Sequence, residues 1–141
     1  YLSWARSNRS TLVRVPGYRP DSEAACRLEV RSPDPSANPY LAFAVMLAAG
    51  LKGIEDGLDL QPACENADLS SLDRRDLREL GVGTLPESLG EAVELFASSD
   101  LMRETLGEHI HGYLVAAKRA EWGEYQSSVS QWERDRYLAV L

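Results

Sequence analysis

The chain has 141 residues, a length that suits one domain with a moderate hydrophobic core. Its hydrophobic content of 44% and charged content of 26% are ordinary for a soluble globular protein. The net charge of −7 argues against nucleic acid or an anionic membrane as the main partner, because both require a basic surface.

Positive charge is nevertheless concentrated near the start of the chain. The arginines among the first 31 residues are Arg6, Arg9, Arg14, Arg19, Arg27 and Arg31. Guanidinium groups bind phosphate and carboxylate with a fixed two-pronged geometry. An arginine-rich segment in an acidic chain therefore predicts a local anion site.

Two short strands are predicted in this region. The first covers residues 10–15 and ends at Pro16, before a polar loop that runs through Glu23. The second, Arg27–Arg31, alternates charged and apolar side chains, so its charged groups should share one face, with the carboxylate of Glu29 between two guanidinium groups. A connection of roughly a dozen residues permits antiparallel pairing of the two strands.

A rigid turn and a helix follow. The turn, Pro33–Pro39, is dense in residues that fix φ or hydrogen-bond their own backbone. Asn38 is expected to cap a helix that begins at Pro39 and runs to about Asp56, with Gly57 as its stop.

This helix is apolar on nearly all sides before Lys52, which predicts burial on most of its faces. Gly50 and Gly53 predict close packing against another element. Its apolar run, Leu41–Leu51, is well short of the ~20 residues that span a bilayer.

The second half of the chain is predicted to be helical after a loop at Leu58–Ala67. The predicted segments are a short helix over Leu72–Leu80 closed by Gly81, a helix over Ser88–Ala97, a turn from Ser99 through Leu106, and a long helix over Glu108–Leu141 that breaks near Ser127-Ser128.

Several other residues are expected to be structural. Cys26 and Cys64 lack the spacing of a zinc or redox motif and should be free thiols in a cytoplasmic protein. His109 and His111, two positions apart on a helix, point about 200° from each other and should be surface or packing residues. The C-terminal aromatic residues that should form a packing stripe are Trp122, Tyr125, Trp132 and Tyr137.

Two sequence blocks resemble those of a known enzyme family. Residues 29–54, EVRSPDPSANPYLAFAVMLAAGLKGI, and residues 4–16, WARSNRSTLVRVP, are similar in order and spacing to the E-x-R-x-P-D-P-x-A-N-P-Y-L and N-R-S-x-x-x-R-I-P blocks of the glutamine synthetase family. The resemblance is good from Tyr1 to about Leu60 and looser beyond.

The resemblance implies an α+β fold in which a few antiparallel strands are backed by several helices. It also implies that residues 1–141 are a fragment, the C-terminal portion of a catalytic domain. The first half of that domain and a small N-terminal β domain would precede it in the full-length protein.

The resemblance further implies roles for individual side chains. Glu29 matches a ligand of Mg²⁺ or Mn²⁺, whose other ligands would lie in the missing part. Arg31 matches the arginine that holds the carboxylate of glutamate and helps to stabilise transferred phosphate. Arg9, Arg14 and Arg27 match arginines around the phosphates of ATP. Arg9 and Arg31 are the expected catalytic residues.

The implied activity is the ATP-dependent ligation of ammonia to the γ-carboxylate of glutamate, through γ-glutamyl phosphate. The full-length enzyme would serve nitrogen metabolism in the cytoplasm and self-associate into a ring-like homo-oligomer. The isolated fragment should be inactive, because phosphoryl transfer needs metal ligands that it lacks.

Two departures from the family keep the nitrogen nucleophile open. Many bacterial members carry a modifiable tyrosine where this chain has Ala67, within Glu65–Leu69. The ending SQWERDRYLAVL lacks the H-P-x-E-F of those members and is more similar to members that ligate other amines. The alternatives are therefore ligation of a polyamine or other amine, or a non-catalytic helical assembly domain, which only the acidic helices from Leu72 onward support.

Overall fold

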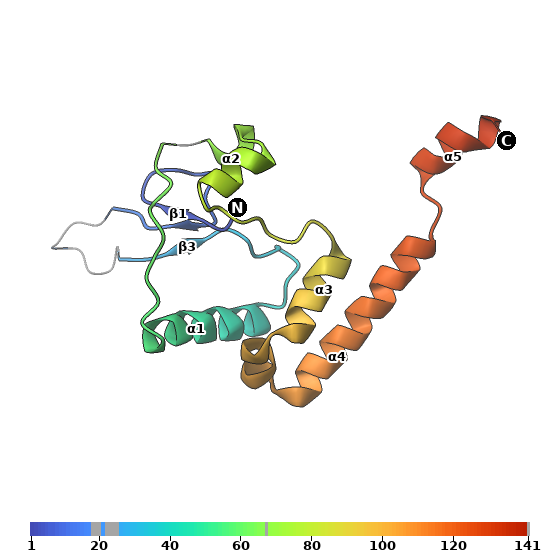
Figure 1. Ribbon diagram of the computed structural model, residues 1–141. Helices are drawn as coiled ribbons and strands as arrows, with labels where there is room; N and C mark the ends of the chain where they lie inside the picture. Colours follow the sequence, from blue (N-terminus) through green and yellow to red (C-terminus); the bar gives the residue numbers. More distant parts are fainter. Residues whose placement is uncertain (18–20, 22–25, 67, 141) are drawn as a thin grey trace. The chain divides into compact units, whose positions relative to one another are not determined.

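The computed structural model describes residues 1–17, 21, 26–66 and 68–140. The chain divides into two compact units, Tyr1–Leu85 and Pro86–Leu141, whose elements are coloured along the sequence in Figure 1. Strands and helices together confirm the predicted α+β class. Arg19, the end of the polar loop at Glu23, Ala67 and Leu141 were part of the sequence predictions and lie outside the described residues.

The first unit contains a small mixed sheet in the order β1-β2-β3. β1 (Trp4–Ala5) pairs parallel with β2 (Val13–Arg14), and β2 pairs antiparallel with β3 (Glu29–Val30). The antiparallel pairing of the two predicted strands is confirmed, whereas the parallel pair was not predicted.

The strands are shorter than predicted for a local reason. Asn8 Oδ1 accepts hydrogen bonds from Ser10 N at 2.9 Å and from Ser10 Oγ at 2.8 Å. An asparagine that bonds its own backbone two residues on holds a turn in place of a strand. Regular pairing therefore begins only at Val13.

Three buried apolar residues of this unit form a small cluster, to which the buried Ala5 of β1 does not belong. Leu69, Leu77 and Val82 pack together, with the half-buried Cys64 and Leu72 against them. Leu69 lies in the short 3₁₀ helix η2 (Leu69–Ser71), and Leu77 lies in α2 (Arg74–Glu79), capped by Asp73 and followed by Gly81 at φ +67°. The predicted short helix with a glycine stop is thus confirmed.

The longest helix of the first unit, α1 (Pro39–Glu55), begins and ends as predicted. Asn38 Oδ1 accepts from Tyr40 N at 3.0 Å, Asp56 is the C-cap, and Gly57 follows at φ +60°. These local signals explain why its bounds could be predicted.

The predicted burial of α1 is wrong in this chain. The structure describes the whole of α1, and none of its residues is buried. Tyr40 is 84% exposed and Ile54 78% exposed, and a Cβ built on Gly50 would meet no atom within 4 Å. A helix that is apolar on nearly all sides needs cover on more than one side, and the small core of this unit lies elsewhere.

The second unit consists of helices. α3 (Leu89–Ser98), capped by Ser88, packs against α4 (Asp100–Ser127), as Figure 1 shows. Residues 100–106, which were predicted as a turn, form the first part of α4, and the helix is kinked at Gly107, which has φ 75° and ψ 156°. The predicted break after Ser127 is confirmed, because α5 (Gln131–Tyr137) starts anew and ends in η3 (Leu138–Val140).

His111 has a packing role, as predicted for this pair of histidines. It is 5% exposed, its ring stacks on Phe96 with centroids 4.9 Å apart, and its Nε2 donates to the Phe96 carbonyl at 3.1 Å. Since a carbonyl can only accept, the contact requires a proton on Nε2. His109 is exposed.

The C-terminal aromatic residues form two separate pairs, which corrects the predicted stripe. Trp122 stacks with Tyr125 at 5.4 Å, and Trp132 meets Tyr137 edge-on at 6.0 Å. Three of the four are exposed, and the helix break after Ser127 separates the pairs.

Among the described residues, every helix is too short or too polar to span a bilayer. Cys26 and Cys64 are both free, as expected.

Candidate functional site

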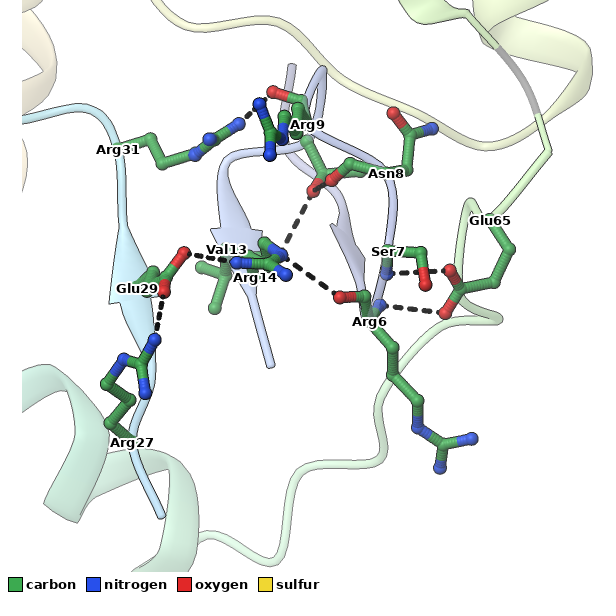
Figure 2. Close-up of polar contacts among 11 residues, drawn as sticks. Arg6, Ser7, Asn8, Arg9, Val13, Arg14, Arg27, Glu29, Arg31 and Glu65 are labelled. Atoms are coloured by element: carbon green, nitrogen blue, oxygen red, sulfur yellow. Dashed lines mark hydrogen bonds and ion pairs between the residues drawn. The ribbon is translucent and has the colours of Figure 1, made fainter. Parts of the chain in front are cut away.

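The predicted charged residues meet across β2 and β3. Arg14 and Glu29 are paired in the strand register, and Arg14 Nη1 lies 3.0 Å from Glu29 Oε2. Arg27 Nη2 lies 2.9 Å from Glu29 Oε1, so each carboxylate oxygen binds a different guanidinium group (Figure 2). The predicted anion between two cations is therefore present.

One of its two cations differs from the prediction. The alternation of Arg27–Arg31 placed Arg27 and Arg31 beside Glu29, but the second cation is Arg14, from the neighbouring strand. Arg31 Nη1 donates instead to the backbone carbonyl of Arg9. The backbone pairing continues to Arg31, whose N donates to the carbonyl of Leu12 at 2.9 Å, so the difference lies in where the side chain of Arg31 finds its partner.

Two backbone carbonyls of the loop before β2 orient these arginines. Arg14 Nε donates to the carbonyl of Arg6 at 3.1 Å, and Arg31 donates to the carbonyl of Arg9. Figure 2 shows both guanidinium groups directed at the loop. The loop thus holds one arginine of β2 and one that directly follows β3, and it also carries Arg9.

The electrostatics of the cluster keep Glu29 ionised. The hydrogen bond from Arg14, followed by that from Arg27, lowers the pKa of Glu29 from its ordinary value of 4.5. Its side chain is 28% exposed, so water weakens these attractions without removing them. Glu29 is therefore an anion at neutral pH.

The donor set does not by itself make a metal site. Among the described residues, no group of three or more histidine, cysteine or acidic side chains could hold a metal ion. Hard divalent cations need several oxygen ligands, and both oxygens of Glu29 already accept from arginines. The described residues therefore do not fit Mg²⁺ or Mn²⁺ without further ligands.

Sequence reasoning missed one residue of the site, Glu65. Its Oε1 accepts from Arg6 N at 2.8 Å and its Oε2 accepts from Ser7 N at 3.1 Å. These bonds, that from Arg6 first, lower the pKa of Glu65. Next to it, Asn8 Nδ2 donates to the carbonyl of Cys64 at 2.7 Å. No local pattern could signal a contact between residues 59 positions apart.

Arg9 and Glu65 border one open hollow. It measures about 400 Å³ and combines a cation, carboxylates and hydroxyl groups, which suits a polar ligand. Its lining residues are Ser7, Asn8, Arg9, Ser10, Glu65, Asn66 and Asp68.

The predicted site residues Arg14, Arg27 and Glu29 lie in one ion-paired cluster. Arg31 lies outside this cluster and donates to the carbonyl of Arg9 in the loop before β2.

A family model and individual relatives indicate the same protein family for this chain. The sequence model of the family described as "Glutamine synthetase, catalytic domain" matches residues 1–137. The chain is 48% identical to a glutamine synthetase of Mycolicibacterium smegmatis over 138 residues, covering 98% of this chain and 31% of that protein. It is 42% identical to the glutamine synthetase of Methanosarcina mazei over 142 residues, covering 100% of this chain and 31% of that protein.

A solved structure agrees with these sequences. The chain superposes on a protein described as "Apo GmaS without ligand" with a TM-score of 0.75 and 33% identity. The match covers 96% of this chain and 29% of that one. The chain thus spans about a third of the length of the relatives that it matches.

Proposed function

This chain belongs to the glutamine synthetase family, and we propose that the full-length protein ligates ammonia to the γ-carboxylate of glutamate with ATP. In this proposal, residues 1–141 are the C-terminal portion of the catalytic domain. Their contribution is the set of arginines and the carboxylate that surround the β2–β3 pair.

The observation that supports the proposal is that three arginine side chains are held in place beside the loop that carries Arg9. Arg14 and Arg27 bind the same carboxylate, and Arg14 and Arg31 donate to the carbonyls of Arg6 and Arg9 in the loop before β2. Guanidinium groups held in place before the substrate arrives stabilise charge without reorganising during the reaction. Such a set suits the transfer of a phosphoryl group, in which charge spreads over several oxygens.

The proposed reaction has two steps. First, a γ-carboxylate oxygen of glutamate attacks the γ-phosphorus of ATP, and the bond to the bridging oxygen of ADP breaks. Second, the nitrogen of ammonia attacks the acyl carbon of γ-glutamyl phosphate, inorganic phosphate leaves with the former carboxylate oxygen, and the nitrogen loses a proton. Phosphate is the leaving group, so no covalent enzyme intermediate is needed.

Each arginine has a proposed role in these steps. Arg9, Arg14 and Arg27 bind the phosphates of ATP and neutralise the charge that develops on them. Arg31 holds the carboxylate of glutamate and stabilises the transferred phosphate. A guanidinium has five N–H donors, so the contact of Arg31 with the carbonyl of Arg9 orients the group while leaving it able to bind an anion.

The metal role of Glu29 stays a prediction. Mg²⁺ or Mn²⁺ would help to neutralise the nucleotide phosphates, and Glu29 would be one ligand among several. Because no group of three or more potential metal ligands lies among the described residues, the isolated 141-residue chain should release no phosphate from ATP in the presence of glutamate and ammonium. Turnover near that of the full-length protein would contradict this assignment. The cytoplasmic location and the ring-like homo-oligomer also stay predictions.

A second candidate is the ligation of a polyamine or another amine to glutamate. The segment SQWERDRYLAVL supports it, because this segment is more similar to members of the family that ligate other amines. The proposed partners of the arginines are phosphate and carboxylate groups. The arginines therefore give no information on whether the nitrogen nucleophile is ammonia or another amine. Ammonia remains the first choice because it is the commoner substrate of the family.

The test is one assay of the full-length protein with four nitrogen donors. Ammonium, putrescine, spermine and a monoamine are compared at the same ATP and glutamate concentrations, and kcat/KM ranks them. Ammonium should give the highest value. A value more than about tenfold higher for any amine would establish the second candidate, and no ATP-dependent turnover with any donor would favour an assembly domain.

A further inference from the structure

One peptide group of the loop before β2 is bound on both of its sides. The carbonyl of Arg6 accepts from Arg14 Nε at 3.1 Å, and Ser7 N donates to Glu65 Oε2 at 3.1 Å. The C=O of residue 6 and the N–H of residue 7 belong to one planar trans peptide and point in opposite directions. The orientation of this peptide is thus shared between Glu65 and the guanidinium of Arg14.

Glu65 binds the loop through two hydrogen bonds, one to each of its carboxylate oxygens. Its other oxygen accepts from Arg6 N at 2.8 Å, so two successive N–H groups bind one carboxylate (Figure 2). Two bonds to a charged acceptor define the rotation of the peptide as well as its position. Figure 2 also shows Glu65 on the side of the loop that faces away from the arginine cluster.

The segment that carries Glu65 is itself anchored along the first strand. Trp4 Nε1 donates to the carbonyl of Gln61 at 2.7 Å, and Cys64 N donates to the carbonyl of Trp4 at 2.9 Å. Asn8 Nδ2 donates to the carbonyl of Cys64 at 2.7 Å. Glu65 is therefore held at a fixed place and can transmit that placement to the loop.

We propose that Glu65 is a positioning residue for ATP binding, acting through the Arg6-Ser7 peptide to orient Arg14. The sequence of contacts runs from Glu65 through this peptide to Arg14, and from Arg14 to Glu29. Glu65 need not touch the substrate. This inference rests on the proposed function, because it assumes that Arg14 binds the phosphates of ATP.

Replacing the carboxylate by an amide tests the contact. In Glu65→Gln, one acceptor oxygen becomes an NH₂ donor that faces a backbone N–H, so one of the two bonds is lost and the peptide can rotate. In the full-length protein, we expect kcat/KM for ATP to fall about tenfold or more, mainly through a higher KM for ATP. Glu65→Asp keeps both acceptor oxygens and should retain clearly more activity.

Glu94→Gln is a matched control. Glu94 Oε1 and Oε2 accept from Arg119 Nε and Nη2 at 2.8 Å each, so this carboxylate also makes two hydrogen bonds, but in the second unit. Glu94→Gln should leave kcat/KM for ATP unchanged. Activities are normalised to folded protein by circular dichroism. Equal losses in Glu65→Gln and Glu94→Gln, or in Glu65→Gln and Glu65→Asp, would overturn the inference.

A double-mutant cycle separates positioning from general stability. If Glu65 acts through Arg14, Glu65→Gln should cost little further kcat/KM in an Arg14→Lys background, whereas independent effects would multiply. Multiplying effects would overturn the inference. If the unsubstituted protein shows no ATP-dependent ligation, the proposed function itself fails; if it is active and Glu65→Gln equals it, only the role of Glu65 fails.

Discussion

Arg14 and Glu29 face each other across the antiparallel pair β2–β3, with Arg14 Nη1 3.0 Å from Glu29 Oε2. This ion pair links the two sequence blocks that carry the family resemblance. Because each residue belongs to a different strand, strand pairing and charge pairing support one another. The side chains are 27% and 28% exposed, so the pair is neither fully solvated nor fully desolvated.

The ion pair gives a prediction about pH. Arg14 and then Arg27 lower the pKa of Glu29 below its ordinary value of 4.5. A lowered folded-state pKa means that the pairing stabilises the fold fully above about 4.5 and loses this effect as pH falls through the lower folded-state value. Glu29→Gln should therefore be less stable than the unsubstituted chain near neutral pH, and the difference should vanish in acid.

Denaturant midpoints of both proteins over about pH 2.5 to 7 check this expectation. Several other carboxylates also have lowered pKa values, so only the difference between the two proteins is informative. A difference that grows on acidification would contradict the assignment of the shift to Arg14 and Arg27.

Arg31 provides a test of bidentate anion binding. In the full-length protein, Arg31→Lys should lower glutamate-dependent kcat/KM by about 10²-fold or more, because a point charge cannot reproduce the two-pronged contact of a guanidinium. Arg119→Lys is the control: its partner is Glu94, in the second unit, and it should leave activity nearly unchanged. Similar activities of the two variants would remove Arg31 from the proposed site.

Local signals in the sequence explain the parts of the fold that were predicted correctly. Asn38 and Gly57 act on their immediate neighbours, so the bounds of α1 follow from capping chemistry alone. The break after Ser127 is likewise local. The pairing of β2 with β3 needed only two strand-forming segments and a connection long enough for the chain to reverse direction.

Long-range contacts account for what the sequence could not show. Glu65 meets Arg6 across 59 positions, and neither residue type nor spacing signals that contact. The partner of Glu29 was assigned by alternation within one strand, but Arg14 reaches it from the next strand. The burial of α1 was inferred from its own apolar pattern, although burial depends on which other elements are present.

The exposed face of α1 gives a prediction that distinguishes this chain from a longer one. Leu47 is 66% exposed, so Leu47→Lys should change the stability of the 141-residue chain by no more than about 0.5 kcal/mol. If the rest of the full-length protein covers α1, the same substitution there should cost more than about 2 kcal/mol, because it buries a charge.

Denaturant unfolding of both proteins measures the difference. Glu55→Gln, at an exposed position of the same helix, is the control and should be near neutral in both. A neutral Leu47→Lys in the full-length protein would mean that this face of α1 stays uncovered there.

The packing of α3 on α4 gives the last prediction, at Gly90. A Cβ built on Gly90 would lie 2.5 Å from Trp122 Nε1 and 2.8 Å from its Cε2, closer than real contacts allow. Gly90→Ala must therefore displace the indole, and overpacking of this kind costs about 1–3 kcal/mol.

Gly112, in α4, is the matched control, because a Cβ built there would meet nothing within 4 Å. Gly112→Ala should therefore gain about 0.4–1 kcal/mol of stability from reduced chain entropy. Thermal unfolding followed by circular dichroism and tryptophan emission should show a lower midpoint for Gly90→Ala and a higher one for Gly112→Ala. Shifts in the same direction would show that helix propensity outweighs the contact with Trp122.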